Sequence, residues 1–143
     1  MRRARHRGVR GFTNFAVTVA AVASVALGVT FLVAGAAKVV AGPLWTRNAR
    51  AIGAPKIIIP AVPWLEIVIG ALLCAQIARV PVALAAAALL IAFTALLLIR
   101  LAQGEHPACA CFGTWSATPL GWSHVARNIA LIGIAVLVGV EGR

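Results

Sequence analysis

Residues 82–99 read VALAAAALLIAFTALLLI, a run of 18 residues that holds no charged side chain. About 20 consecutive apolar residues in a helix are needed to cross the hydrocarbon core of a bilayer. Arg100 follows the run directly, and long basic side chains at the end of a span reach towards the lipid headgroups. We therefore predict a membrane-spanning helix over residues 82–102.

The composition of the whole chain agrees with a membrane location. Of its 143 residues, 62% are hydrophobic and only 11% are charged. A water-soluble domain of this size is about half apolar and about a quarter charged. The chain has too little polar surface to cover a soluble globule, so the excess apolar surface is expected to face lipid.

Three further apolar segments predict an all-α integral membrane four-helix bundle. We expect the additional spans over residues 15–40, 60–78 and 124–140, with a tight turn at Arg79-Val80-Pro81 and a membrane domain over residues 14–143. In the first long loop, Trp45, Ala49 and Ile52 share one helical face, which predicts a short interfacial helix. The tryptophans at 45, 64, 115 and 122 are expected to act as interfacial anchors.

The charge distribution predicts the orientation of this bundle. The formal net charge is +10, and residues 1–13 form a basic tail that contains Arg2, Arg3, Arg5, Arg7 and Arg10. Cytoplasmic segments of cell-membrane proteins carry such positive charge. We therefore expect both termini on the cytoplasmic side of the cell membrane and the two longer loops on the extracytoplasmic side. No aromatic side chains alternate with the arginines, which argues against nucleic-acid binding and leaves the lipid bilayer as the partner of the tail.

Four ionisable residues are expected at the outer edge of the bundle. Each lies near that end of a different span: Lys38, Glu66, Arg100 and Arg127. Because charges inside a membrane are costly, Glu66 should pair with Lys38 or Arg127. The pair could fix helix register or serve function, and both readings stay open. The sequence shows no cofactor motif, although a cationic pocket here would suit a quinone headgroup as electron source or sink.

Cys109-Ala110-Cys111 is the segment whose residue types most clearly indicate a chemical role. Outside the cytoplasm such a pair is oxidised, and a ring this small is strained and easily reduced. Neighbouring Arg100 and Arg127, together with a protonated His106, would favour a thiolate. A structural disulfide and a redox-active pair are both compatible with the spacing. A weaker alternative is a metal held by His106, Cys109 and Cys111, and our prediction is that no metal is bound. Cys74 is expected to be a packing residue.

Several short strings together resemble the MauE family, small membrane proteins of the DoxX-like group named for methylamine utilisation. These strings are Gly35-Ala36-Ala37-Lys38, Pro63-Trp64-Leu65-Glu66, Cys109-Ala110-Cys111-Phe112-Gly113 and Arg127-Asn128. The resemblance covers nearly all of the chain after the arginine tail. It implies four membrane helices and a role in the maturation of extracytoplasmic enzymes, alongside a thioredoxin-like companion.

Residues and resemblance together predict a membrane thiol–disulfide redox or maturation factor. Cys109 and Cys111 would be the redox pair, supported by the charges of Arg127, Lys38 and Glu66. The partner would be an extracytoplasmic thioredoxin-like protein or a cysteine-rich client. The alternative is a non-catalytic assembly or scaffold subunit, in which the cysteines close a loop and the charges hold helices in register.

Overall fold

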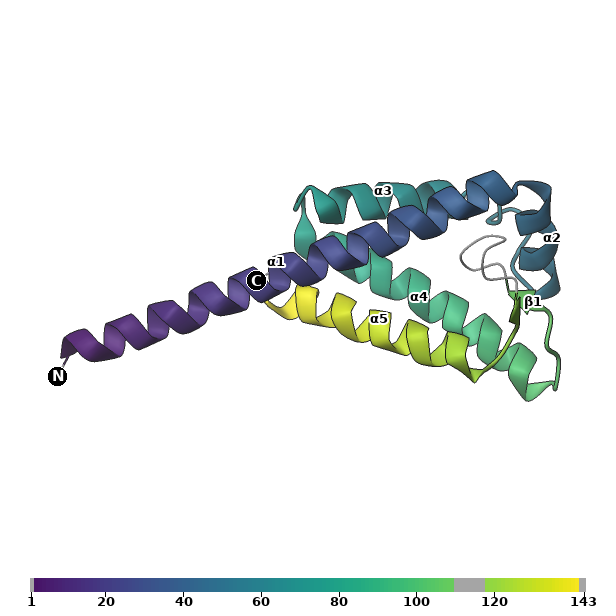
Figure 1. The fold of residues 1–143 in the computed structure, drawn as a ribbon. Helices are drawn as coiled ribbons and strands as arrows, with labels where there is room; N and C mark the ends of the chain where they lie inside the picture. Colours follow the sequence, from purple (N-terminus) through teal and green to yellow (C-terminus); the bar gives the residue numbers. More distant parts are fainter. Residues whose placement is uncertain (1, 110–117, 142–143) are drawn as a thin grey trace.

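The computed structural model describes the backbone of residues 2–109 and 118–141 and the side chains of residues 13–108 and 118–141. Within these ranges the regular structure is helical apart from one pair of short strands, and turns connect the elements (Figure 1). The elements, in chain order, are α1 (Arg2–Ala41), α2 (Pro43–Ala51), α3 (Val62–Cys74), α4 (Arg79–Ala102), β1 (Ala108–Cys109), β2 (Thr118–Pro119) and α5 (Trp122–Glu141).

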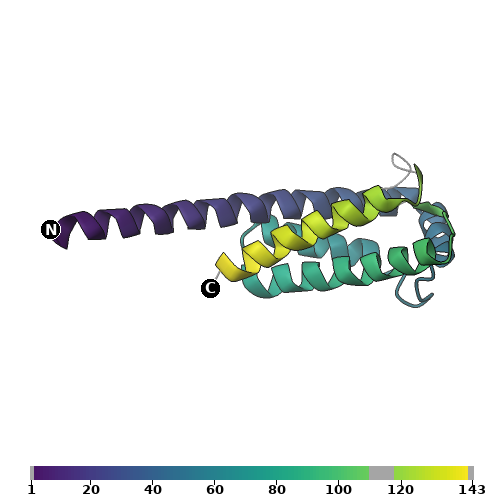
Figure 2. The ribbon, with the colours of Figure 1, turned by 90° about the horizontal axis from the view of Figure 1, so that it is seen from below.

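Helix α1 is longer than the predicted first span, because the basic segment continues the same helix towards the N-terminus. This part projects beyond the other helices (Figure 2). The helix ends where the sequence reads Gly42-Pro43. Gly42 has φ +51°, a left-handed conformation that glycine adopts without strain, and proline then starts α2 at a position where its missing N–H is not needed.

Helix α2 is the short helix that the sequence predicts in the first long loop. Its apolar face, however, packs against the protein and not against the membrane surface. Trp45 and Ala49 are buried, and Ile52 directly after the helix is buried too. The expectation that Trp45 anchors the chain in the lipid interface is therefore wrong. Trp64 and Trp122 are 61% and 70% exposed, as side chains at a lipid interface would be.

Helix α3 is shorter than the predicted span over residues 60–78. Its 13 residues rise about 20 Å, less than the ~30 Å of a hydrocarbon core. Gln76 and Ala78 both have positive φ, so the chain reverses there and α4 begins at Arg79. The turn predicted at residues 79–81 is thus wrong by a few positions, whereas α3 and α4 are antiparallel neighbours as expected (Figure 1).

Helices α4 and α5 agree closely with the predicted spans over residues 82–102 and 124–140. The chain between them forms a hairpin in which Ala108 lies opposite Pro119 and Cys109 opposite Thr118. The hairpin is fixed to the helices at its base. There Leu120 is buried in an apolar cluster with Ile52, Leu97 and Val125.

Helices α1 and α3 pack at very short range through glycines. A Cβ atom on Gly28 would lie 2.8 Å from the Gly70 carbonyl oxygen, and one on Gly70 would lie 2.7 Å from the Gly28 carbonyl oxygen. A Cβ on Gly35 would lie 2.7 Å from the carbonyl oxygen of Pro63. Small residues allow this backbone approach between membrane helices, and these three glycines provide it here.

Helices α1, α3, α4 and α5 form one cluster, in which α1 contacts α3 and α5 while α4 contacts α3 and α5. The core holds Leu27, Phe31, Leu73, Ala83 and Ala86. Large apolar side chains cover the outside of all four helices and include Val22, Val29, Val33, Val68, Leu84, Ile91, Ile129 and Val136. So much exposed apolar surface marks a membrane-facing protein.

Three helical segments of the described chain are long and apolar enough to cross a membrane: Thr13–Ala41, Arg79–Ala102 and Trp122–Glu141. Both chain ends lie at the same end of the molecule, opposite α2 and the hairpin (Figure 1). A fourth span, the sidedness of the termini and the division into tail and membrane domain stay predictions.

Candidate functional site

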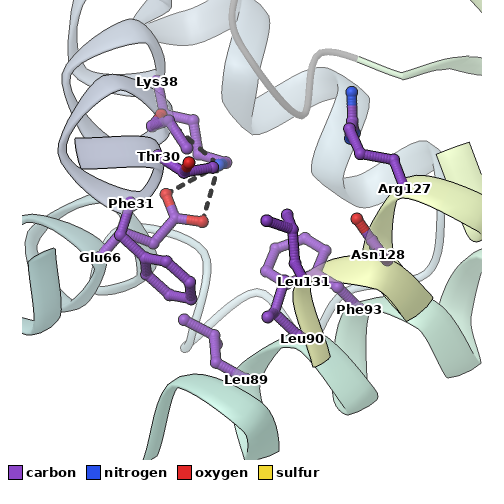
Figure 3. A pocket seen from close by; sticks show the side chains of 11 residues that line it. Thr30, Phe31, Lys38, Glu66, Leu89, Leu90, Phe93, Arg127, Asn128 and Leu131 are labelled. Atoms are coloured by element: carbon purple, nitrogen blue, oxygen red, sulfur yellow. Dashed lines mark hydrogen bonds and ion pairs between the residues drawn. The ribbon is translucent and has the colours of Figure 1, made fainter. Parts of the chain in front are cut away.

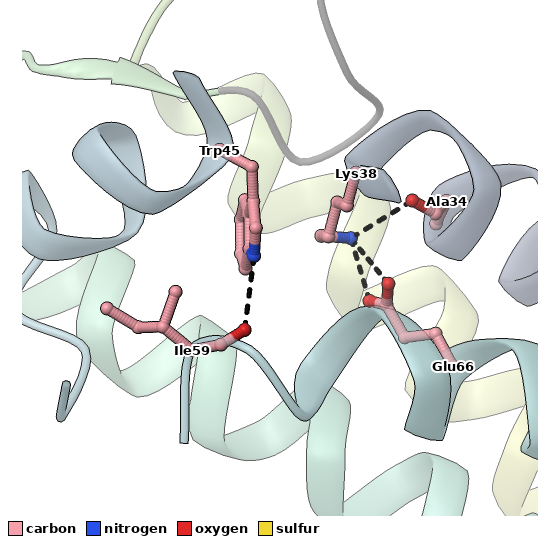
Figure 4. A network of polar contacts seen from close by, with 5 residues as sticks. All are labelled: Ala34, Lys38, Trp45, Ile59 and Glu66. Atoms are coloured by element: carbon pink, nitrogen blue, oxygen red, sulfur yellow. Dashed lines mark hydrogen bonds and ion pairs between the residues drawn. The ribbon is translucent and has the colours of Figure 1, made fainter. Parts of the chain in front are cut away.

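A buried ion pair joins α1 to α3 at the end of the cluster nearest α2. The Lys38 ammonium nitrogen donates to both carboxylate oxygens of Glu66, at 2.8 and 2.7 Å, and more weakly to the Ala34 carbonyl oxygen at 3.5 Å (Figure 4). The two side chains are only 3% and 8% exposed. The expected pairing of Glu66 is therefore confirmed, with Lys38 as the partner.

Two aromatic rings enclose the ammonium group of this pair. The Lys38 nitrogen lies 5.2 Å from the centre of the Trp45 ring and 5.7 Å from the centre of the Phe93 ring, within the range of cation–π attraction. Trp45 is held in place because its indole N–H donates to the Ile59 carbonyl oxygen at 3.2 Å (Figure 4). Helix α2 therefore contributes directly to the environment of Lys38.

A cavity of about 40 Å³ lies beside the ion pair, between α1, α3, α4 and α5. Arg127 and Asn128 of α5 line it across from Lys38 and Glu66 (Figure 3). The rest of its wall is mostly apolar and comes from Thr30, Phe31, Ala34, Leu89, Leu90, Phe93 and Leu131. Three of the predicted site residues, Lys38, Glu66 and Arg127, thus share one cavity.

Arg100 lies at this end of the bundle, as expected, but it does not line the cavity. Its guanidinium donates to the Glu105 carboxylate at 2.8 Å and to the Gln103 side-chain oxygen at 3.5 Å. It lies against Gly53, where an added Cβ would be 2.9 Å from a guanidinium nitrogen. The position of Arg100 at the end of α4 lets it pair with the loop that follows instead of turning inwards.

The hairpin carries the first cysteine of the C-x-C string. Cys109 is the last residue of β1, and its side chain lies outside the described side chains; Cys111 lies outside the described residues altogether. The base of the hairpin is well held. Leu120 N–H donates to the Pro107 carbonyl oxygen at 3.0 Å, and the His106 imidazole donates to the Leu120 carbonyl oxygen at 2.8 Å.

The alternative of a metal site falls partly outside the described residues. Among the side chains at 13–108 and 118–141, no three His, Cys, Asp or Glu residues gather closely enough to hold a metal ion. The nearby His124 accepts the Gly121 N–H through Nδ1 at 3.3 Å, which leaves Nε2 to donate to the Thr118 hydroxyl at 3.4 Å.

Cys74 is a packing residue, as predicted. Its sulfur lies 3.9 Å from the Val25 carbonyl oxygen and fills the space beside Gly28, where an added Cβ would approach it to 2.7 Å. It lies at the far end of α3, eight residues after Glu66, or about 12 Å along the helix axis. Cys74 is therefore separate from both the cavity and the hairpin.

Two aromatic residues of the site were missed by sequence reasoning. Phe93 is the one aromatic residue in the apolar stretch of residues 82–99. A single ring among small aliphatic side chains could have indicated that this position has a specific contact. Trp45 gave a less clear signal, because an apolar helical face looks the same whether it packs on lipid or on protein. Both rings contact the Lys38 ammonium group.

This arrangement can do two things chemically. The bidentate ion pair fixes α1 against α3, since each partner would be strongly disfavoured if buried alone. The second cation, Arg127, and the amide of Asn128 face the same cavity and can donate hydrogen bonds to a group bound there. Fold, apolar surface and buried charges together define a small, all-helical integral membrane protein.

Comparison with known proteins places the chain within one family. The family model described as "Methylamine utilisation protein MauE" matches residues 16–141, so the chain belongs to the MauE family. It is similar to the methylamine utilization protein MauE of Paracoccus denitrificans, with 33% identity over 95 residues, 64% of this chain and 51% of that protein. The chain thus aligns with about half the length of that curated relative. No solved structure matches it.

Proposed function

We propose that this protein is a MauE-like accessory factor that supports the maturation of an extracytoplasmic protein by thiol–disulfide exchange. The observation that carries the proposal is the position of Cys109. Its backbone lies in β1, at the end of the molecule opposite both chain ends (Figure 1). Lys38 lies three residues before the end of α1, and Glu66 and Arg127 lie four and five residues after the starts of α3 and α5, at the same end. Family membership supports the accessory role.

The proposed orientation follows from the arginine-rich start of α1. If that segment lies in the cytoplasm of a cell-membrane protein, the hairpin and α2 lie on the extracytoplasmic side. Helix α3 then crosses as a short fourth span. Its close glycine contacts with α1 shield its backbone, and local thinning of the bilayer can accommodate the remaining length.

The exchange reaction needs only the two cysteines and a partner disulfide. A thiolate of the pair attacks one sulfur of the partner's disulfide, which forms a mixed disulfide and releases the other partner sulfur as a thiolate. The second cysteine then attacks the mixed bond, so the C-x-C pair becomes oxidised and the partner leaves as a dithiol. The reverse sequence oxidises a cysteine-rich client. A quinone as final electron source or sink stays a prediction.

The proposal predicts that a single-cysteine variant traps its partner. One cysteine of the pair starts the exchange and the other resolves the mixed disulfide. Of the two variants Cys109→Ala and Cys111→Ala, the one that lacks the resolving cysteine should accumulate a covalent adduct. The trapped partner would be an extracytoplasmic thioredoxin-like protein or a cysteine-rich client. The measurement is non-reducing electrophoresis followed by mass spectrometry of bands that collapse on reduction. A Cys74→Ala variant serves as the control and should trap nothing. If neither variant forms an adduct under oxidising conditions, exchange is the wrong mechanism.

A second candidate function is a non-catalytic assembly subunit. The buried Lys38–Glu66 pair favours it, because this pair and the glycine contacts bind α1 to α3 without any need for chemistry. Under this alternative the cysteines would close the hairpin only.

A further inference from the structure

The chain between α2 and α3 carries large apolar side chains on the outside of the protein. Ile57 is 86% exposed and Ile58 is 49% exposed, and Pro60 is exposed as well. Ile59 is buried and packs against α2 in the core. Residues 57–61, here named the apolar loop, are therefore fixed to the protein by one side chain and present the others outwards.

The backbone of the apolar loop suits a place without water. In the hydrocarbon of a bilayer each backbone N–H needs a partner within the protein. The N–H groups of Ile58 and Ile59 donate to the Pro55 carbonyl oxygen at 3.0 and 3.3 Å, and that of Ala61 donates to the Ile58 carbonyl oxygen at 2.9 Å. Pro60 has no N–H. From Ile58 to Ala61 the loop can thus leave water without exposing an unpaired donor.

The apolar loop lies at the depth of the membrane-spanning helices. Figure 2 shows the chain between α2 and α3 level with the last turns of α4, beside the bundle and not beyond its end. Helix α4 is long and apolar enough to cross a membrane. In the first turn of α3, Trp64 and Leu65 are exposed too. An apolar outer surface therefore continues along the chain from the loop into α3.

Basic side chains precede the apolar loop. Arg47, Arg50 and Lys56 are exposed, and residues 39–65 contain no Asp or Glu. Two of the three acidic residues of the sequence form the ion pairs described above, and the third, Glu141, ends α5 near the opposite end of the molecule. The charge of this surface is therefore complementary to anionic lipid headgroups, which attract basic side chains at a membrane surface.

We propose that the apolar loop inserts into the lipid bilayer, with Ile57 and Ile58 among the upper parts of the acyl chains, and that Arg50 and Lys56 bind the phosphates of anionic lipids. An apolar surface flanked by basic side chains is typical of segments that lie in a membrane interface. The bilayer is favoured over a second protein because the loop continues the apolar outer surface of α3. The inference does not rest on thiol–disulfide exchange, because it involves no cysteine.

Quenching by spin-labelled lipid tests the insertion. An environment-sensitive fluorophore is attached to Ile57→Cys in a Cys74→Ala/Cys109→Ala/Cys111→Ala background, in nanodiscs that hold one protein each. Phosphatidylcholine with a nitroxide near the top of its acyl chain should quench this label at least about twofold, because interfacial segments reach about 5–10 Å into the bilayer. Gln103→Cys, an exposed polar position directly after α4, is the matched control and should be quenched much less.

A second arm tests the binding of anionic lipid. Phosphatidylglycerol with the same nitroxide should quench the Ile57→Cys label more strongly than phosphatidylcholine does at equal content. Arg50→Gln/Lys56→Gln should remove this preference and keep the quenching by phosphatidylcholine, whereas Arg79→Gln, at the opposite end of α4, should leave the preference unchanged. All substituted loop side chains are exposed, so the core is preserved.

Two results would overturn the inference. If neither lipid quenches the label at residue 57 more than the label at residue 103, the loop lies in water or under another protein. A second copy of the chain cannot cover it in nanodiscs with a single protein. If both lipids quench equally, or if the preference survives Arg50→Gln/Lys56→Gln, the two basic residues do not bind lipid phosphates.

Discussion

Replacing Glu66 with glutamine is expected to lower the free energy of unfolding by about 3–5 kcal/mol, the cost of leaving one partner of a buried ion pair without its counter-charge. In the native protein the Glu66 carboxylate accepts two hydrogen bonds from Lys38, and both side chains are less than a tenth exposed. A glutamine at this position can still accept a hydrogen bond but cannot neutralise the ammonium group. Unfolding by denaturing detergent, followed by circular dichroism, measures the difference.

The chain provides a matched control for the Glu66 prediction. Glu105 pairs with Arg100 at 2.8 Å, nearly the same distance, but the two side chains are 53% and 27% exposed. Glu105→Gln should therefore cost less than about 1 kcal/mol, because exposed ion pairs contribute little. The double variant Lys38→Met/Glu66→Leu should recover most of the lost stability, since it removes both buried charges. Equal costs for Glu66→Gln and Glu105→Gln would show that burial does not control the strength of the pair.

The second large effect is expected from Cys109→Ser/Cys111→Ser. If the protein acts by exchange, this double variant should lose all accessory activity, because serine oxygen forms no mixed disulfide. The measurement is complementation of a deletion strain, with the level of mature extracytoplasmic client as the readout. Cys74→Ser is the control and should complement fully, since Cys74 lies far from the hairpin and packs against Gly28. Full complementation by the double variant would instead support the assembly subunit.

The parts of the fold that sequence predicts well are those set by simple physical requirements. Helices α4 and α5 follow from the length of their apolar runs. The Lys38–Glu66 pair follows from the rarity of charges in such runs, because a single buried carboxylate must find a cation. The glycine contacts of α1 with α3 follow from the preference for small residues where helices approach closely.

Other features of the fold and of the site depend on tertiary contacts that no sequence pattern indicates. Helix α3 ends early because Gln76 and Ala78 adopt left-handed conformations, which neither residue type signals. Trp45 is buried because α2 folds back over Lys38, and a hydrophobic face alone does not distinguish lipid from protein. Arg100 turns towards Glu105, five residues later in the chain, instead of joining the cavity.

The most direct test of the account is the accessibility of the C-x-C pair in living cells. A Cys74→Ala background leaves Cys109 and Cys111 as the remaining thiols of the chain. After mild reduction, intact cells are treated with a maleimide reagent that does not cross membranes. The account predicts that both cysteines react from outside, and that little labelling occurs without prior reduction. Labelling that appears only after the membrane is permeabilised would place the pair in the cytoplasm and contradict the proposed function.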